Sequence, residues 1–186
     1  MAKKSKKITV SNLGGYHPEP ELCKWPSGSI FEIEGKRLYD LVRGLKPLVI
    51  VEIGGFNGCS TSWIAKALRD NKKGKIISID NHVHGGHWKL MPEELKEYAV
   101  FVNADAFTCD VPENIDMVFE DGMHSPWFTK KVAQRFKPSM VFVSHDYCHN
   151  SDVGRNVKRD FDEMFGEPDE VFFENPSDCG LAIKYT

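Results

Sequence analysis

The stretch that decides the fold is LVIVEIGGFNGCST, residues 48–61. It opens with an apolar run, residues 48–53, which only Glu52 interrupts, and such a run predicts a strand buried on both faces. Gly54, Gly55 and Gly58 then permit a sharp turn and a close approach of the backbone to a ligand. A predicted helix, residues 60–68, follows at once and offers unpaired N–H groups at its start. The pattern is typical of a nucleotide-binding turn, although glycines used for turn geometry alone would look the same.

On both sides of this stretch, short apolar runs alternate with helical patterns. Further strands are predicted at 75–80, 99–103, 115–119, 140–144, 170–174 and 181–185. Further helices are predicted at 30–45, 127–136 and 156–165. Nearly continuous apolar strands indicate a parallel sheet covered on both faces. We therefore expect an open, doubly wound α/β fold, with ligands bound at the carboxyl ends of the strands.

Length and composition narrow the class of protein. The chain has 186 residues, of which 41% are hydrophobic, and this suits a basic flexible tail over residues 1–11 and a single domain over residues 12–186. The net charge of −3 argues against a nucleic-acid coat or a polybasic membrane binder. No apolar run is long enough for a bilayer span or a secretion signal, so we expect a cytoplasmic protein. Five cysteines without a C-x-x-C pair favour reduced thiols over a disulfide frame or a zinc site.

An acidic residue lies where a ribose-binding side chain is expected. The second predicted strand ends in Asp80, about 20 residues beyond Gly58, the spacing at which an acidic side chain accepts hydrogen bonds from ribose hydroxyls. A dinucleotide fingerprint, G-x-G-x-x-G, would need glycines where this chain has Phe56 and Cys59. The turn therefore disfavours NAD.

Three motifs follow three predicted strands in order. They are Glu52-Ile53-Gly54 with Gly58-Cys59-Ser60-Thr61, Asp121-Gly122-Met123-His124, and His145-Asp146-Tyr147. In these residues the chain resembles the class I S-adenosylmethionine (SAM)-dependent methyltransferases, in particular a small O-methyltransferase-like branch, from about residue 30 to the C-terminus. The resemblance implies a Rossmann-like, mostly parallel seven-stranded sheet with an antiparallel last strand and helices on both faces.

The same resemblance implies SAM as the cofactor. Gly54 and Gly58 would lie beside its methionine and ribose parts with Glu52 near them, and Asp80 would hold the ribose. Asp105 would pair with the adenine amino group, Ala106 would lie against the ring, and Asp121 would face the reaction centre. The residues expected to bind the cofactor are thus Glu52, Gly54, Gly55, Gly58, Ser60, Asp80, Asp105, Ala106 and Asp121.

Methyl transfer from a sulfonium is an in-line displacement, so the protein must align the acceptor and remove its proton. The candidate catalytic residues are Asp121, His124, His145 and Asp146. The two histidines are candidate general bases because histidine titrates near pH ~6.5, although they would also serve to hold loops by hydrogen bonds. Related enzymes in some cases hold a divalent cation after the fourth and fifth strands, which makes Asp121 and Asp146 candidate ligands for Mg²⁺ or another divalent cation. The nearby histidines would broaden the choice of metal.

The loop His82-Val83-His84-Gly85-Gly86-His87-Trp88 has the spacing of a metal site, but we expect it to cover the cofactor or wall the substrate instead. The function expected is O-methylation of a small-molecule, sugar or aglycone hydroxyl. Methylation of RNA or protein, or cofactor binding without catalysis, are the alternatives. We expect a small-molecule acceptor and neither a membrane nor a nucleic-acid partner. A homo-oligomer that completes the acceptor site stays open, since few segments are available to shape it.

Overall fold

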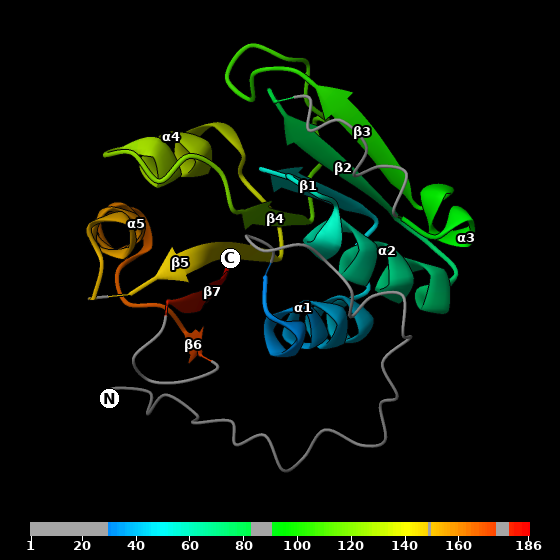
Figure 1. Ribbon diagram of the computed structural model, residues 1–186, viewed down its shortest axis with the longest axis horizontal. Helices are drawn as coiled ribbons and strands as arrows, with labels where there is room; N and C mark the ends of the chain where they lie inside the picture. Colours follow the sequence, from blue (N-terminus) through cyan, green and yellow to red (C-terminus); the bar gives the residue numbers. More distant parts are fainter. Residues whose placement is uncertain (1–29, 83–90, 149, 174–178) are drawn as a thin grey trace.

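The computed structural model describes residues 30–82, 91–148, 150–173 and 179–186, which form one seven-stranded sheet with helices on its two faces (Figure 1). The strands are β1 (Val49–Ile53), β2 (Lys75–Asp80), β3 (Ala99–Asn103), β4 (Met117–Glu120), β5 (Val141–Tyr147), β6 (Glu170–Phe172) and β7 (Gly180–Tyr185). The helices are α1 (Glu32–Leu45), α2 (Cys59–Asn71), α3 (Glu93–Lys96), α4 (Phe128–Arg135) and α5 (Asp152–Phe165).

The strand order is β3-β2-β1-β4-β5-β7-β6, with β1 to β5 parallel and β7 antiparallel to both β5 and β6. The expected doubly wound, mostly parallel sheet with an antiparallel last strand is therefore confirmed. The bounds differ in detail: α5 begins at Asp152, four residues earlier than its apolar spacing predicts, because Ser151 caps it by accepting a hydrogen bond from the Gly154 amide. The short helix α3 was not predicted from the sequence.

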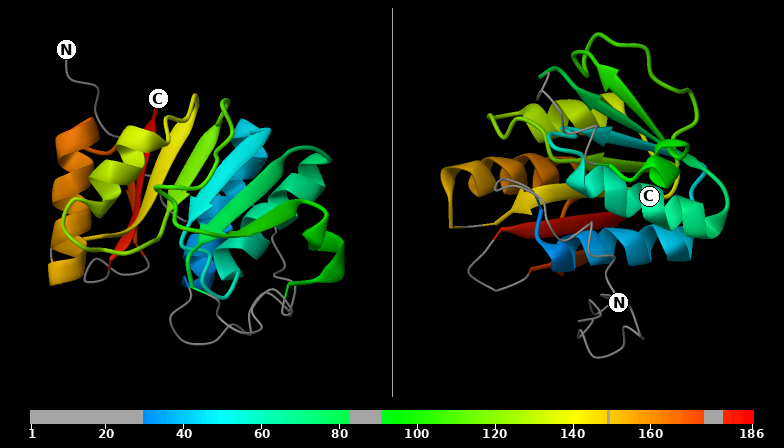
Figure 2. Two further views of the ribbon diagram at one scale, coloured as in Figure 1. Left: turned by 90° about the horizontal axis from the view of Figure 1, so that it is seen from above. Right: turned by 45° about the vertical axis from the view of Figure 1, so that its right-hand side comes forward.

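Two apolar cores lie on opposite faces of the sheet (Figure 2). Helices α1 and α2 pack on one face, and α4 and α5 on the other. The first core centres on Trp63 of α2, against which Gly35 of α1 packs so closely that a Cβ there would lie 2.2 Å from the indole nitrogen. The second core contains Phe136, Phe142 and Phe161. This packing fixes α1 tightly against α2.

The order of the strands places a switch point between β1 and β4. The chain runs outward from β1 through β2 to β3, and then returns to pair β4 with the other side of β1. The connections after β1 and β4 therefore leave the sheet in opposite directions and open a crevice at the carboxyl ends of these strands. Residues just after β1 and β4 are thereby brought together.

Strand β5 is irregular at its carboxyl end. Its pairing with β7 shifts register between Ser144 and Tyr147, and Asp146 has a positive φ of 56°. Neighbouring side chains of a regular strand point to opposite faces, whereas a bulge re-aims one of them. His145 and Asp146 lie at this irregularity.

One prediction about the cysteines is wrong. Cys148, directly after β5, forms a disulfide with Cys179, directly before β7. Antiparallel pairing of these two strands brings the two residues together, and sequence spacing alone does not reveal such a contact. Cys59 and Cys109 are free, whereas Cys23 and the predicted tail, residues 1–11, lie outside the described residues. None of the helices in the described ranges has both the length and the apolar character that a membrane span requires.

Candidate functional site

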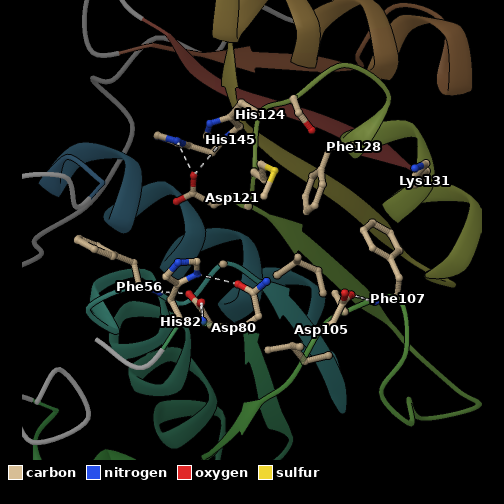
Figure 3. Close-up of a pocket in the computed structure, with 18 of the residues that line it drawn as sticks. Phe56, Asp80, His82, Asp105, Phe107, Asp121, His124, Phe128, Lys131 and His145 are labelled. Carbon is tan, nitrogen blue, oxygen red and sulfur yellow. Dashed lines mark hydrogen bonds and ion pairs between the residues drawn. The ribbon is translucent and has the colours of Figure 1, made fainter. Parts of the chain in front are cut away.

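A cavity of about 590 Å³ lies at the carboxyl ends of β1 to β5 (Figure 3). A volume of this size suits a ligand of cofactor or drug size. The structure brings eight of the predicted site residues into its wall: Gly54, Asp80, Asp105, Ala106, Asp121, His124, His145 and Asp146. These residues lie at or just after the carboxyl ends of five different strands, and parallel pairing gathers those ends at one edge of the sheet.

The turn after β1 needs glycine for a physical reason. Gly54 has a φ of 86°, and a Cβ there would lie 2.1 Å from the carbonyl oxygen of Asp121. The backbone after β1 thus packs directly on the backbone after β4. Gly58 also has a positive φ, 79°, but a Cβ there would meet open space. The two glycines therefore serve different purposes, close contact at the first and helix entry at the second.

Glu52 is fully buried and stabilises this turn by binding the first turn of α2. Its carboxylate accepts hydrogen bonds from Ser60 Oγ at 2.6 Å and Thr61 Oγ1 at 2.5 Å, both in the first turn of α2. Burial raises the pKa of Glu52, and the hydroxyl donors offset part of that rise. Glu52 and Gly58 do not line the large cavity, whereas Gly55 and Ser60 line a much smaller one beside it.

Two carboxylates stand at one end of the cavity. Asp80 accepts hydrogen bonds from the backbone N–H of Phe56 at 2.9 Å and of His82 at 2.8 Å. Asp105 accepts one from the Phe107 N–H at 2.7 Å. Each carboxylate oxygen has two lone pairs, so both groups keep acceptor capacity for a ligand. The end of the cavity around Asp80 and Asp105 thus offers hydrogen-bond acceptors of fixed position.

The other end holds two histidines and two aspartates, which we call the His/Asp cluster: Asp121, His124, His145 and Asp146. His145 Nδ1 lies 3.0 Å from Asp121 Oδ1 and 3.5 Å from Asp146 Oδ2. His124 Nε2 lies 3.3 Å from Asp146 Oδ2 and 3.8 Å from Asp121 Oδ1. Figure 3 shows both rings turned toward Asp121. The bulge in β5 lets the consecutive residues His145 and Asp146 face the same cluster.

Charge in the cluster is unevenly shared. Burial by itself would lower the pKa of His145, but Asp121, Asp146 and Glu34 beside the ring raise it well above its usual value. Burial would raise the pKa of Asp146, but His145 and then His124 hold it below its usual value. The carboxylates around His145 therefore favour its protonated, cationic form when the cluster binds nothing else.

Another carboxylate supports the cluster from inside the sheet. Glu120, the last residue of β4, is fully buried and accepts hydrogen bonds from Ser144 Oγ at 2.6 Å and Thr129 Oγ1 at 3.0 Å. Burial raises its pKa, while the hydrogen bond from Ser144 and the positive charge that His124 has when protonated oppose that rise. Through these two hydrogen bonds Glu120, the residue before Asp121, links β4 to β5 and to α4.

Asp121, His145 and Asp146 each offer one ligand atom, and these three atoms all lie within 4.8 Å of one another. A set of two carboxylates and one imidazole suits divalent metals that accept both oxygen and nitrogen ligands. The arrangement can thus either hold a cation or carry protons between carboxylates and histidines.

Several residues of the site were not identified from the sequence. The cavity is also lined by Phe56, Asn81, Met123, Phe128 and Lys131. The rings of Phe107 and Phe128 make an edge-to-face contact there, with their centroids 5.5 Å apart. Glu34, on α1, contacts His145 and gave no signal, because its charge looks like that of any exposed helix residue. Asn81 and Met123 lie close to the ends of predicted strands, as Asp80 and Asp121 do. That position in the sequence could have identified them as cavity residues.

Two predicted features behave differently from the rest. Tyr147, the last residue of the H-D-Y motif, turns away and donates a hydrogen bond to Asp162 of α5 at 2.9 Å. In the histidine loop, His82 lines the cavity, whereas residues 83–88 lie outside the described residues, and so the expected cover over the cofactor stays a prediction.

Comparison with known proteins gives one family. A model described as "Methyltransferase domain" matches residues 51–151, which run from within β1 to just past β5 and include the His/Asp cluster. No curated protein matches the sequence.

Several solved structures share the fold. The O-methyltransferase TomG from Streptomyces achromogenes, involved in tomaymycin synthesis and solved in complex with SAM, is 21% identical with a TM-score of 0.69, and the match covers 91% of each chain. An O-methyltransferase from Bacillus cereus in complex with SAH is 17% identical with a TM-score of 0.65, over 87% of this chain and 84% of that one. An SAH-bound methyltransferase from Podospora anserina is 14% identical with a TM-score of 0.66, over 93% and 91%.

Proposed function

Because this chain belongs to the methyltransferase-domain family, whose model matches residues 51–151, we propose that it transfers a methyl group from SAM to a hydroxyl oxygen of a small molecule. One observation carries the proposal. A single cavity joins the two acceptor carboxylates, Asp80 and Asp105, to the His/Asp cluster, so one ligand can be held at one end while its neighbour reacts at the other.

The residues at the first end fit the adenosyl part of SAM. Asp80 and Asp105 present carboxylate oxygens that suit ribose hydroxyls and an adenine amino group, respectively. The small apolar side chain of Ala106 lines the same cavity, and the Gly54 turn brings backbone within reach of the ligand. Glu52 acts beneath the turn, through Ser60 and Thr61, and does not itself contact the ligand in this assignment.

When bound, SAM supplies an electrophilic methyl group: the acceptor oxygen bonds to the methyl carbon, the carbon–sulfur bond breaks, and S-adenosylhomocysteine (SAH) leaves. The protein has two tasks, to hold the acceptor in line and to take its proton. We assign proton removal to His124, because the carboxylates around His145 favour its protonated form, which cannot accept a further proton. Asp146 Oδ2, 3.3 Å from His124 Nε2, then stabilises the charge that His124 gains.

A divalent cation is the second way in which this cluster can activate a hydroxyl. Asp121, His145 and Asp146 would hold it, and His145 would give up its Nδ1 proton on binding. The cation would supply a positive charge that lowers the pKa of a coordinated hydroxyl. A nitrogen ligand favours Mn²⁺, Fe²⁺ or Zn²⁺ over Mg²⁺ in this set.

The test measures thermal unfolding with SAM, SAH and NAD, each with EDTA, Mg²⁺ or Mn²⁺. At about 100 times its dissociation constant, a ligand adds roughly 2.7 kcal/mol, which raises the unfolding temperature by about 5 to 10 °C. We expect this shift with SAM and SAH and none with NAD. Asp80→Ala should lose it, while Asp110→Ala, at an exposed carboxylate away from the cavity, should keep it.

Turnover is then tested with methyl-labelled SAM and a panel of phenols, catechols, sugars and hydroxylated aglycones. Label appearing in an acceptor as a methyl ether supports the proposal. SAH binding without labelled product in any arm would reduce the assignment to a cofactor-binding protein. Activity that survives EDTA would assign proton removal to His124 alone, and activity that Mn²⁺ restores would assign it to the cation.

A further inference from the structure

Glu34, on the first turn of α1, is fully buried and reaches the His/Asp cluster from outside the sheet. Its Oε2 accepts a hydrogen bond from the Phe31 N–H at 3.0 Å and lies 3.1 Å from His145 Nε2. A carboxylate in the interior costs free energy unless it is paired. The residue is therefore held at this place by its contact with His145 and by the start of its own helix.

Packing alone does not account for a carboxylate here. Glu34 Oε1 is buried and has no hydrogen-bond partner within the described part of the chain. Such an atom is a cost that an apolar side chain of similar size would avoid. The next residue, Gly35, packs directly on Trp63, so a shift of the helix away from this position would give up that close packing. The position keeps an acidic group at the expense of stability.

The chemistry of the two groups fixes which ring atom faces the cavity. In the ion pair with Glu34, His145 Nε2 carries the hydrogen, because a carboxylate only accepts hydrogen bonds. Nδ1, on the other side of the ring, is then the atom directed at Asp121 and Asp146, at 3.0 and 3.5 Å. Carboxylates that bind the far nitrogen of a functional histidine fix its ring and its tautomer in the same way.

We propose that Glu34 is a positioning residue of the site, which holds the Nε2–H of His145 and thereby presents Nδ1 to the acceptor end of the cavity. The inference rests on the proposed methyl transfer for its kinetic part only. It is independent of what Nδ1 holds, a proton or a cation, because the Glu34 contact is on the opposite nitrogen. It also explains why α1, which lies outside the residues matched by the family model, belongs to the functional unit.

Two substitutions separate positioning from charge. In Glu34→Gln the amide oxygen can still accept hydrogen bonds from Phe31 and His145, so we expect kcat within about threefold of wild type. In Glu34→Leu the acceptor is lost, and we expect kcat to fall about 10- to 100-fold while the affinity for SAH changes less than twofold. Leu38→Ala, at a buried apolar residue one turn further along the same helix, is the control for lost stability. It should lower the unfolding temperature without lowering kcat at a temperature where the protein stays folded.

A second measurement needs no activity. In ¹⁵N-labelled protein, the Nε2–H of His145 should give a downfield, slowly exchanging proton resonance, which His145→Gln identifies by its loss. The resonance should persist in Glu34→Gln and disappear or exchange rapidly in Glu34→Leu. A Glu34→Leu protein that keeps this resonance, or keeps wild-type kcat, overturns the proposal. Absence of SAH binding in wild type would instead overturn the proposed function, with the resonance still reporting on Glu34.

Discussion

Asp121 Oδ1 lies 3.0 Å from His145 Nδ1, because β4 and β5 pair in parallel with Glu120 opposite Ser144. Asp121 and His145 are the residues that follow these two partners, so they lie at the same level of the sheet. The contact thus follows directly from the register of the sheet. The hydrogen bond that Ser144 Oγ donates to Glu120, at 2.6 Å, stabilises that register. Motifs far apart in the sequence become one cluster by this means.

Substitution by alanine should destabilise the protein more at Gly54 than at Gly58, the two glycines with positive φ in the turn after β1. Gly54→Ala adds a Cβ 2.1 Å from the Asp121 carbonyl oxygen at a φ of 86°, and we expect a loss of roughly 3 kcal/mol or more in the free energy of unfolding. Gly58→Ala meets open space at a φ of 79°, so only backbone strain of about 1–2 kcal/mol remains. Urea denaturation of both variants measures the difference, and equal losses would contradict the close contact at Gly54.

His124→Ala should lower kcat by about 10²- to 10⁴-fold, because it removes the proposed proton acceptor, while SAH affinity stays unchanged. Added imidazole should restore part of the rate. Lys130→Ala on α4, which only breaks the exterior pair with Glu163, is the control and should keep wild-type kcat. Wild-type turnover in His124→Ala would assign the proton to another group.

The ionisation of Asp116 should make the stability of the protein depend on pH in the acidic range. Burial would raise its pKa, but the N–H groups of Leu48 and Val49 and the hydroxyl of Ser139 bind the carboxylate and lower it. A folded-state pKa below the unfolded value means that the stabilisation is complete above about pH 4 and is lost as the pH falls through the folded value.

Asp116→Asn should therefore cost about 1 kcal/mol at pH 7, and its free energy of unfolding should converge with that of wild type in strong acid. Denaturation series at several pH values check this. Asp110→Asn, at an exposed carboxylate, should match wild type throughout. Parallel curves for wild type and Asp116→Asn would refute the lowered pKa.

Cys179→Ser should lower stability markedly, because the Cys148–Cys179 disulfide closes a loop of 31 residues in the unfolded chain. Loop entropy of this size corresponds to roughly 3–4 kcal/mol, or an unfolding temperature lower by about 10 °C. Dithiothreitol should have the same effect on wild type. Cys109→Ser, at a free thiol, should leave the unfolding temperature unchanged. A wild-type protein whose unfolding temperature does not respond to dithiothreitol would speak against the disulfide.

Much of the fold was predictable because strands and helices leave local patterns. The apolar run before Gly54 and its counterparts along the chain predicted all the strands in the described part of the protein, and parallel strands place their carboxyl ends at one edge. The positions of Asp80, Asp105 and Asp121 after three of these strands were therefore enough to assign them to one cavity.

What the sequence by itself determined, then, is the order of the elements and the residues that follow each strand, since periodicity and turn chemistry act over a few neighbours. The tertiary structure alone decided three things: the bulge that turns His145 and Asp146 to one cluster, the pairing of Cys148 with Cys179, and the contact of Glu34 with His145. Each depends on how strands or helices distant in the chain dock against one another. The free energy of that docking is a sum over many contacts, and no single stretch of sequence carries it.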